Sequence, residues 1–137
     1  MSVDFEQISI KPGFMKHNGG VLFRTISETE YQFKAKINEN HLNTAGITHG
    51  GFIAAFVDAG AGTAAHRATN QSPCVTISLD LKFISAVHLG QELIGITKIQ
   101  KKTAKTIFDI IDKSCHKMLY KMFGIQTNIN IKCKVPS

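Results

Sequence analysis

The chain has 137 residues, enough for one domain but not two, because a second core needs roughly 50–100 further residues. Hydrophobic residues make up 43% and charged residues 19% of it, which excludes a disordered chain and predicts a globular one that needs no structural metal or disulfide. Three cysteines without a C-x-x-C pair exclude a secreted disulfide framework and a zinc cluster, and they favour a reducing compartment. We expect a single domain over residues 1–137.

The net charge is +6, which is compatible with nucleic acid, an anionic membrane surface or a small phosphorylated ligand as partner, but an ordinary solvated surface also explains it. The excess lysines are scattered along strand-like segments and form no basic stripe on a helix. The N-terminus lacks the basic and apolar stretches of a signal peptide, and no apolar run approaches the roughly 20 residues of a membrane span. These features predict a cytoplasmic protein without membrane association.

The first third of the chain is expected to begin with a lead-in over residues 1–16 that contains a short helix near Asp4–Ile10. Val21–Ser27 and Tyr31–Ile37 have the composition of two strands around a polar turn. The segment Asn38–His49, rich in Asn, Thr, His and Gly, is expected to be a loop.

A single long helix is predicted over Gly51–Thr69. The positions that recur at helical spacing on its apolar face are Phe52, Ile53, Phe56, Val57, Gly60 and Ala64. Gly60 and Gly62 each cost about 1 kcal/mol relative to Ala inside a helix. Such a helix is therefore expected to lie in close backbone contact with a sheet that wraps around it.

The rest of the chain is predicted to be strands. Cys74–Ile84 alternates apolar and polar residues with a period of two. Glu92–Gln100 and Lys105–Ile111 follow, separated by a turn at Lys101–Ala104, and the final strand is expected over Met118–Ile131. Two strands, one buried helix and an antiparallel meander of four strands define an α+β fold with one sheet around one helix.

The glycine pair Gly50-Gly51 opens the predicted helix. Unpaired backbone N–H groups and the positive end of the helix dipole meet there without side-chain bulk, which suits a phosphate or the oxyanion of an acyl-transfer intermediate. A plain glycine entry turn is the structural alternative. His49, just before the pair, could orient the loop, donate a hydrogen bond to a substrate carbonyl, or act as an acid or base.

Asp58 interrupts the apolar run Phe52–Val57. It is either a surface residue on the outer helix face or a general base or carboxylate nucleophile at a cleft. Gly50 and Asp58 are eight residues apart, about 12 Å along a helix. Because both groups must reach one carbonyl within roughly 3 Å, a shared reaction predicts a dimer with its sites at the interface.

Other residues carry weaker signals. Ser78, on the polar face of its strand, could hold a water or a carbonyl. The histidines show no metal-ligand spacing, so no metal is predicted. The G-x-S-x-G motif of serine hydrolases and the phosphate-loop and dinucleotide fingerprints are absent.

The pattern Asn43-x2-Gly46-x2-His49-Gly50-Gly51-x6-Asp58, followed by a strand with Ser78-x-Asp80, resembles the hotdog-fold acyl-CoA thioesterases. The resemblance is greatest to the branch that holds the phenylacetate-pathway and acyl-CoA thioesterase 13-like proteins, and it covers about Val21 to Ile131. It implies a hotdog fold, hydrolysis of an acyl-CoA with an aryl, short-chain or medium-chain acyl group, and a homodimer, commonly within a dimer of dimers.

The resemblance also implies residue roles. Asp58 matches the catalytic carboxylate, and Gly50, with Gly51 beside it, matches the oxyanion-binding glycine. His49 and Asn43 match residues that support the carbonyl and the loop, and Ser78 matches the hydroxyl that positions water from the opposite subunit. Basic residues near the predicted turn, Lys101, Lys102 and Lys105, match those that hold the coenzyme A phosphates. Coenzyme A is part of the substrate, and neither a cofactor nor a metal is expected.

Two departures concern the coenzyme A contacts, because Ala104 and Ala86 stand where the family often has Gly and Pro. A non-catalytic acyl-CoA-binding or sensor protein and a hotdog hydratase or dehydratase remain as alternatives. A nucleic-acid-binding module is disfavoured, because the aromatic residues are 9 Phe, 2 Tyr and no Trp, mostly in predicted strand cores rather than on a basic face.

Overall fold

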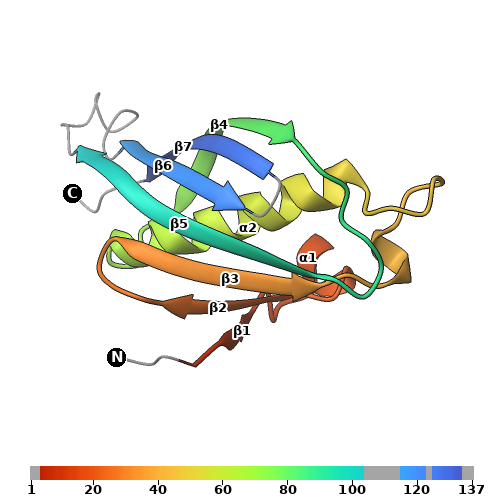
Figure 1. Cartoon of the computed structure of the whole chain (residues 1–137). Helices are drawn as coiled ribbons and strands as arrows, with labels where there is room; N and C mark the ends of the chain where they lie inside the picture. Colours follow the sequence, from red (N-terminus) through yellow and green to blue (C-terminus); the bar gives the residue numbers. More distant parts are fainter. Residues whose placement is uncertain (1–3, 104–114, 123–124, 134–137) are drawn as a thin grey trace.

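The sheet and one long helix define the fold. The computed structural model describes residues 4–103, 115–122 and 125–133. Seven strands form one sheet in the order β1-β2-β3-β5-β6-β7-β4, each pair antiparallel. The helix α2 lies along one face of this curved sheet (Figure 1). The predicted α+β class, with a single antiparallel sheet around one long helix, is confirmed.

The elements in chain order are β1 (Glu6–Ile8), α1 (Phe14–His17), β2 (Val21–Thr25), β3 (Glu30–Lys36), the 3-10 turn η1 (Glu39–His41), α2 (Gly50–Ala68), β4 (Cys74–Phe83), β5 (Glu92–Thr103), β6 (Cys115–Met122) and β7 (Ile125–Cys133). The long helix and the first two predicted strands agree with these bounds to within two residues. The helix expected near Asp4–Ile10 is wrong. Its central residues form β1 instead, because their backbone pairs with β2 in the register Glu6↔Phe23.

The second half of the sheet differs from the simple meander that the sequence predicts. Strand β5 continues to Thr103, so residues 101–103 of the turn expected at Lys101–Ala104 belong to a strand. The expected strand Lys105–Ile111 lies outside the described residues. The single final strand Met118–Ile131 is instead the hairpin of β6 and β7. Strand β4 pairs with β7 and not with β5, so it forms the end of the sheet.

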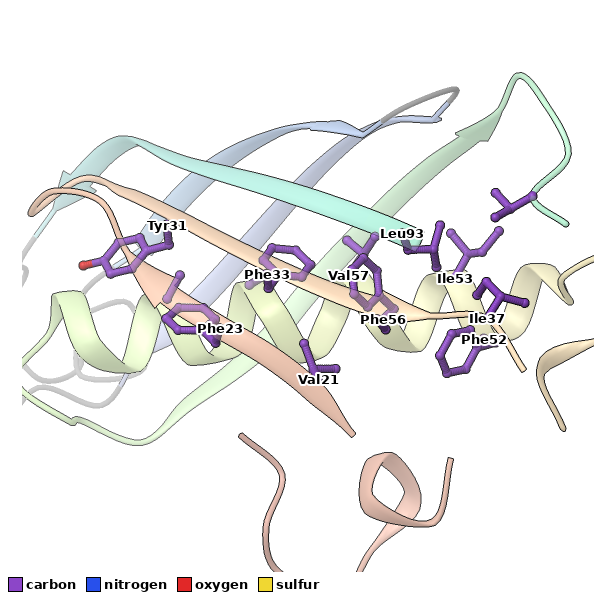
Figure 2. Packing of buried hydrophobic residues seen from close by; sticks show 14 of the residues in the cluster. Val21, Phe23, Tyr31, Phe33, Ile37, Phe52, Ile53, Phe56, Val57 and Leu93 are labelled. Atoms are coloured by element: carbon purple, nitrogen blue, oxygen red, sulfur yellow. The ribbon is translucent and has the colours of Figure 1, made fainter. Parts of the chain in front are cut away.

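Phe33 on β3 lies at the centre of the core, and its ring is fully buried. The ring contacts Phe56 of α2 at a centroid distance of 4.8 Å, and Figure 2 shows the labelled side chains of the sheet packed along the helix. A Cβ at Gly60 of α2 or at Gly95 of β5 would come within 2.4 Å of the Phe33 ring. The glycines therefore allow the close approach of helix and sheet that the sequence predicts, and the six predicted core positions of α2 are all buried.

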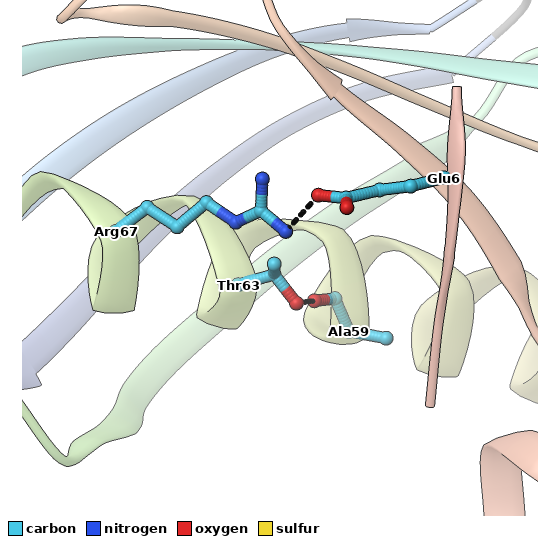
Figure 3. A network of polar contacts seen from close by, with 4 residues as sticks. All are labelled: Glu6, Ala59, Thr63 and Arg67. Carbon is cyan, nitrogen blue, oxygen red and sulfur yellow. Dashed lines mark hydrogen bonds and ion pairs between the residues drawn. The ribbon is translucent and has the colours of Figure 1, made fainter. Parts of the chain in front are cut away.

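An ion pair links strand β1 of the lead-in segment to α2. Arg67 of α2 donates a hydrogen bond to the carboxylate of Glu6 on β1 (Figure 3), and its guanidinium lies 4.7 Å from the centre of the Phe23 ring. Strand β1 is therefore held both by its pairing with β2 and by an ion pair to the opposite layer.

Cys74, at the start of β4, is disulfide-bonded, and the register places it opposite Cys133 of β7. The cysteine count excluded a disulfide framework, so this bond was not expected from the sequence. Positions 74 and 133 face each other only because β4 pairs with β7, which their spacing in the sequence does not reveal.

Strand β4 exposes apolar side chains at the end of the sheet. Val75 and Ile77 are 67% and 55% exposed, and Phe83 is 54% exposed. The alternating pattern predicts a strand correctly here, but its apolar positions lie only partly in the core. Natural edge strands are usually protected, whereas these apolar side chains of β4 are more than half exposed.

Candidate active site

The start of α2 is capped by His49. The backbone of His49 is extended, and its ring Nδ1 accepts a hydrogen bond from the Gly51 N–H at 2.8 Å. This bond requires the neutral ring with its proton on Nε2. A Cβ at Gly51 would lie 2.9 Å from that Nδ1, so the second glycine is what allows the cap to form.

The N–H of Gly50 is left for a ligand. Phe52 and Ile53 donate to the His49 carbonyl at 3.0 and 3.3 Å, while Gly51 donates to the His49 ring. Within the described part of the chain, the Gly50 N–H has no protein acceptor. It lies at the positive end of a 19-residue helix, where a developing negative charge is stabilised.

Asn43 is held by its own loop. Its Oδ1 accepts hydrogen bonds from the N–H groups of Ala45 at 2.9 Å and Ile47 at 3.3 Å, and its backbone N–H donates to the Ile47 carbonyl at 2.8 Å. With the oxygen engaged in this way, the side chain presents its NH₂ as a donor. Asn43 and Gly50 thus both offer N–H groups, which suits a carbonyl oxygen.

Asp58 lies on the exposed side of α2, and its carboxylate accepts a hydrogen bond from the hydroxyl of Thr76 on β4. Sequence reasoning placed this hydroxyl at Ser78 and missed Thr76. Both residues lie on the polar face of a period-two strand, so the pattern alone did not separate them.

A register shift between Thr76 and Ser78 explains why these residues are not equivalent. Thr76 pairs with Ile131 and Ser78 with Asn130, so Ile77 is an extra residue on β4. Such bulges change the direction of nearby side chains and occur often beside active sites. Ser78 itself is exposed and has an interaction of its own.

The predicted site residues form two groups. Asn43, His49, Gly50 and Gly51 lie at or just before the start of α2, whereas Asp58 lies about two turns further along the helix and is hydrogen-bonded to Thr76 of β4. Eight residues of helix separate Gly50 from Asp58, about 12 Å at the standard rise. One chain therefore does not place the oxyanion donor and the carboxylate around the same carbonyl.

Two of the three lysines predicted to bind phosphate lie in a strand and not in a turn. Lys101 and Lys102 belong to β5, where they pair with Lys117 and His116 of β6. Lys105 lies outside the described residues. In the part of the chain that the structure describes, no group of three or more His, Cys, Asp or Glu residues is arranged to hold a metal ion. No described helix has the length and apolar character needed to cross a membrane.

The sequence of the chain is similar to those of known thioesterases. Residues 45–108 match the family model described as Thioesterase superfamily, and this match includes His49, Gly50, Asp58 and Thr76. The chain is 25% identical over 101 residues to acyl-coenzyme A thioesterase 13 of Mus musculus, covering 74% of this chain and 72% of the relative. It is 28% identical over 87 residues to the Homo sapiens protein of the same name, covering 61% of this chain and 62% of that protein.

Solved structures share the fold. Thioesterase superfamily member 2 of zebra fish superposes with a TM-score of 0.74 at 18% identity, covering 92% of this chain and 89% of that one. The smu.793 protein of Streptococcus mutans, bound to acetyl CoA, superposes with a TM-score of 0.71 at 12% identity, covering 96% of this chain and 100% of that one. The predicted hotdog fold and the resemblance to acyl-CoA thioesterases are thus confirmed, and the findings support thioester hydrolase activity.

Proposed function

We propose that the protein hydrolyses acyl-CoA thioesters at two identical sites of a homodimer, each built from both subunits. One subunit supplies the start of α2, with the donors Gly50 N–H and Asn43 Nδ2. The partner subunit supplies its own carboxylate at position 58 and the hydroxyl that holds it. The observation that carries the proposal is the pairing of Asp58 with Thr76 at a distance from Gly50 that a single chain does not bridge.

The reaction follows from these groups. Asp58 takes a proton from water as a general base, and the water oxygen attacks the thioester carbon; direct attack by the carboxylate is the alternative. The carbonyl oxygen becomes an oxyanion that the Gly50 N–H and the Asn43 amide stabilise. The carbon–sulfur bond then breaks, and the products are the free acid and the coenzyme A thiol, which takes up the proton.

The exposed edge of β4 supports the dimer. It carries the apolar side chains of Val75 and Ile77 beside Thr76, so a partner packed on it would also cover the Asp58 half of the site. A dimer of dimers is the assembly expected from the resemblance, and sedimentation together with scattering would determine the number of subunits.

Coenzyme A is the proposed leaving group, with its phosphates near Lys101 and Lys102. The net charge of +6 supports an anionic ligand, and the Streptococcus mutans neighbour is a complex with acetyl CoA. Replacing either lysine by Gln is expected to raise KM for acyl-CoA and to leave kcat nearly unchanged, because these charges bind a part of the substrate remote from the carbonyl.

The test of the function is release of free thiol from acetyl-, phenylacetyl-, benzoyl- and palmitoyl-CoA by the wild type and by Asp58→Asn. We expect turnover of at least one substrate and a loss of about 100-fold or more in the variant, the scale of a general base. An unchanged kcat/KM in the variant would exclude Asp58 as the catalytic carboxylate. Binding of the substrates without turnover by the wild type would instead indicate a sensor protein.

A further inference from the structure

We propose that His41 is a positioning residue that holds the Gly50 N–H in place, an inference that rests on the proposed function. The His41 side chain is 2% exposed. Its Nδ1 accepts a hydrogen bond from the Asn38 N–H at 3.0 Å, and its Nε2 bonds the Asn18 carbonyl at 2.6 Å. Nδ1 as acceptor leaves the proton on Nε2, so the ring is neutral and both nitrogens are engaged.

His41 contacts the chain on both sides of Gly50, once through its backbone carbonyl and once through its ring. On the side before it, the carbonyl of His41 accepts a hydrogen bond from the His49 N–H at 2.7 Å. On the side after it, the ring stacks on Phe52 in the first turn of α2, with 3.8 Å between ring centres and 16° between planes. His49, just before the oxyanion donor, and Phe52, in the turn after it, thus both contact one buried residue, whose backbone is held in place by the two hydrogen bonds of its ring.

This position matters for the rate more than for substrate binding. An oxyanion donor acts when it lies about 2.7–3.1 Å from the place where charge develops, and displacements of about 1 Å cost large factors in rate. Coenzyme A contacts elsewhere in the substrate do not depend on this geometry. Loss of the His41 bonds should therefore lower kcat and leave KM almost unchanged.

The same bonds bring the lead-in segment into the support of the site. Asn18 follows α1 directly, and its side chain donates to the Phe14 carbonyl at 2.8 Å. The carbonyl of Asn18 is the acceptor for His41, so α1 supports the loop that precedes Gly50.

Three variants separate positioning from stability. His41→Phe keeps a ring to stack on Phe52 and removes both hydrogen bonds, whereas His41→Gln keeps one acceptor and one donor and removes the ring. Thr69→Val is the matched control, because it removes a buried hydroxyl that donates to the Ala65 carbonyl at 2.7 Å at the far end of α2. Each is assayed at the same interval below its own Tm.

We expect His41→Phe to lose kcat by about tenfold or more, less than the 100-fold to 1,000-fold loss of removing an oxyanion donor outright, with KM unchanged. Thr69→Val should stay within about threefold of wild type, and His41→Gln, which keeps a donor and an acceptor but loses the stack on Phe52, should have a kcat between those of the wild type and His41→Phe. Amide hydrogen exchange supplies a readout that needs no turnover: the His49 and Gly51 amides should exchange faster in His41→Phe and not in the control.

Equal kcat in His41→Phe and Thr69→Val, or unchanged exchange at His49 and Gly51, would overturn the proposal. A wild-type protein without turnover of any thioester is a different result, because it overturns the proposed function. The exchange data alone would then decide whether His41 holds the start of α2.

Discussion

The hydroxyl of Thr76 on β4 donates a hydrogen bond to the carboxylate of Asp58 on α2. This bond joins the helix to the last strand of the sheet at the point where the proposed chemistry needs an oriented carboxylate. It leaves the second carboxylate oxygen of Asp58 to act on a water.

Thr76→Val should lower kcat by about 10- to 100-fold, because it removes a hydrogen bond to a charged group, a contact of about 1.5–3 kcal/mol. Thr76→Ser keeps the hydroxyl and should retain most of the activity. Thiol release measures both. If Ser78 is instead the hydroxyl that positions the water, Ser78→Ala will show the larger loss and Thr76→Val the smaller one.

Mixed dimers test the sharing of the site between subunits. Asn43→Asp keeps the oxygen that the loop N–H groups use and removes the NH₂ donor, whereas Asp58→Asn removes the carboxylate. Each variant alone should be nearly inactive. After unfolding and refolding in equal amounts, half of the dimers are mixed and contain one intact site, so about a quarter of wild-type activity should return.

No recovery in a mixture that does form mixed dimers, as shown by a tagged subunit, would place both groups in one chain. Mixtures of each variant with itself, refolded in the same way, are the controls for losses during refolding.

The contact between Gly60 and Phe33 predicts a pair of opposite stability changes. Gly60→Ala places a Cβ 2.3 Å from the Phe33 ring, and overpacking of this kind should cost about 1–3 kcal/mol of unfolding free energy. Gly62→Ala, two residues along the same helix, meets nothing within 4 Å and should stabilise by about 0.5–1 kcal/mol. Denaturant unfolding of both variants measures the difference, and equal effects would contradict this packing of α2 on β3.

The buried hydroxyl of Tyr31 should make the free energy of unfolding depend on pH in alkaline solution. Burial raises the pKa of this hydroxyl above the usual 10.0. The nearby charge of Arg67 lowers this pKa by a smaller amount, and that of Glu28 raises it slightly. The unfolded chain ionises first, so this contribution is fully present below about pH 10 and is lost as the pH rises through the higher pKa of the folded state. The Tm of Tyr31→Phe should therefore fall less than that of the wild type between about pH 9 and pH 11. Parallel curves would contradict the raised pKa.

The sequence was informative where the pattern is local. The bounds of α2 and the buried positions Phe52, Phe56 and Gly60 follow from helical spacing and small residues, and the site loop with His49 and Gly50 follows from its position before the helix. These features depend on neighbours within a few residues, which a single sequence displays directly.

The features that the sequence did not reveal depend on distant pairing. Thr76 and Ser78 are equivalent in a period-two pattern until the bulge at Ile77 separates them, and that bulge arises from the register with β7. The disulfide at Cys74 and the place of β4 at the end of the sheet have the same origin. The strand at Glu6–Ile8 is too short to show a period, so only its pairing with β2 defines it.

The place of β4 in the sheet also has a consequence for the order in which the protein folds. Strand β4 pairs only with β7 among the described strands, and β7 follows it in the chain only after β5 and β6. Asp58 is therefore synthesised, and its helix can form, long before the strand that carries Thr76 has a neighbour to hold it. Contacts across so long a sequence separation are slow to form, so catalytic competence should appear as one of the last events of folding, after the helix and the first strands have packed.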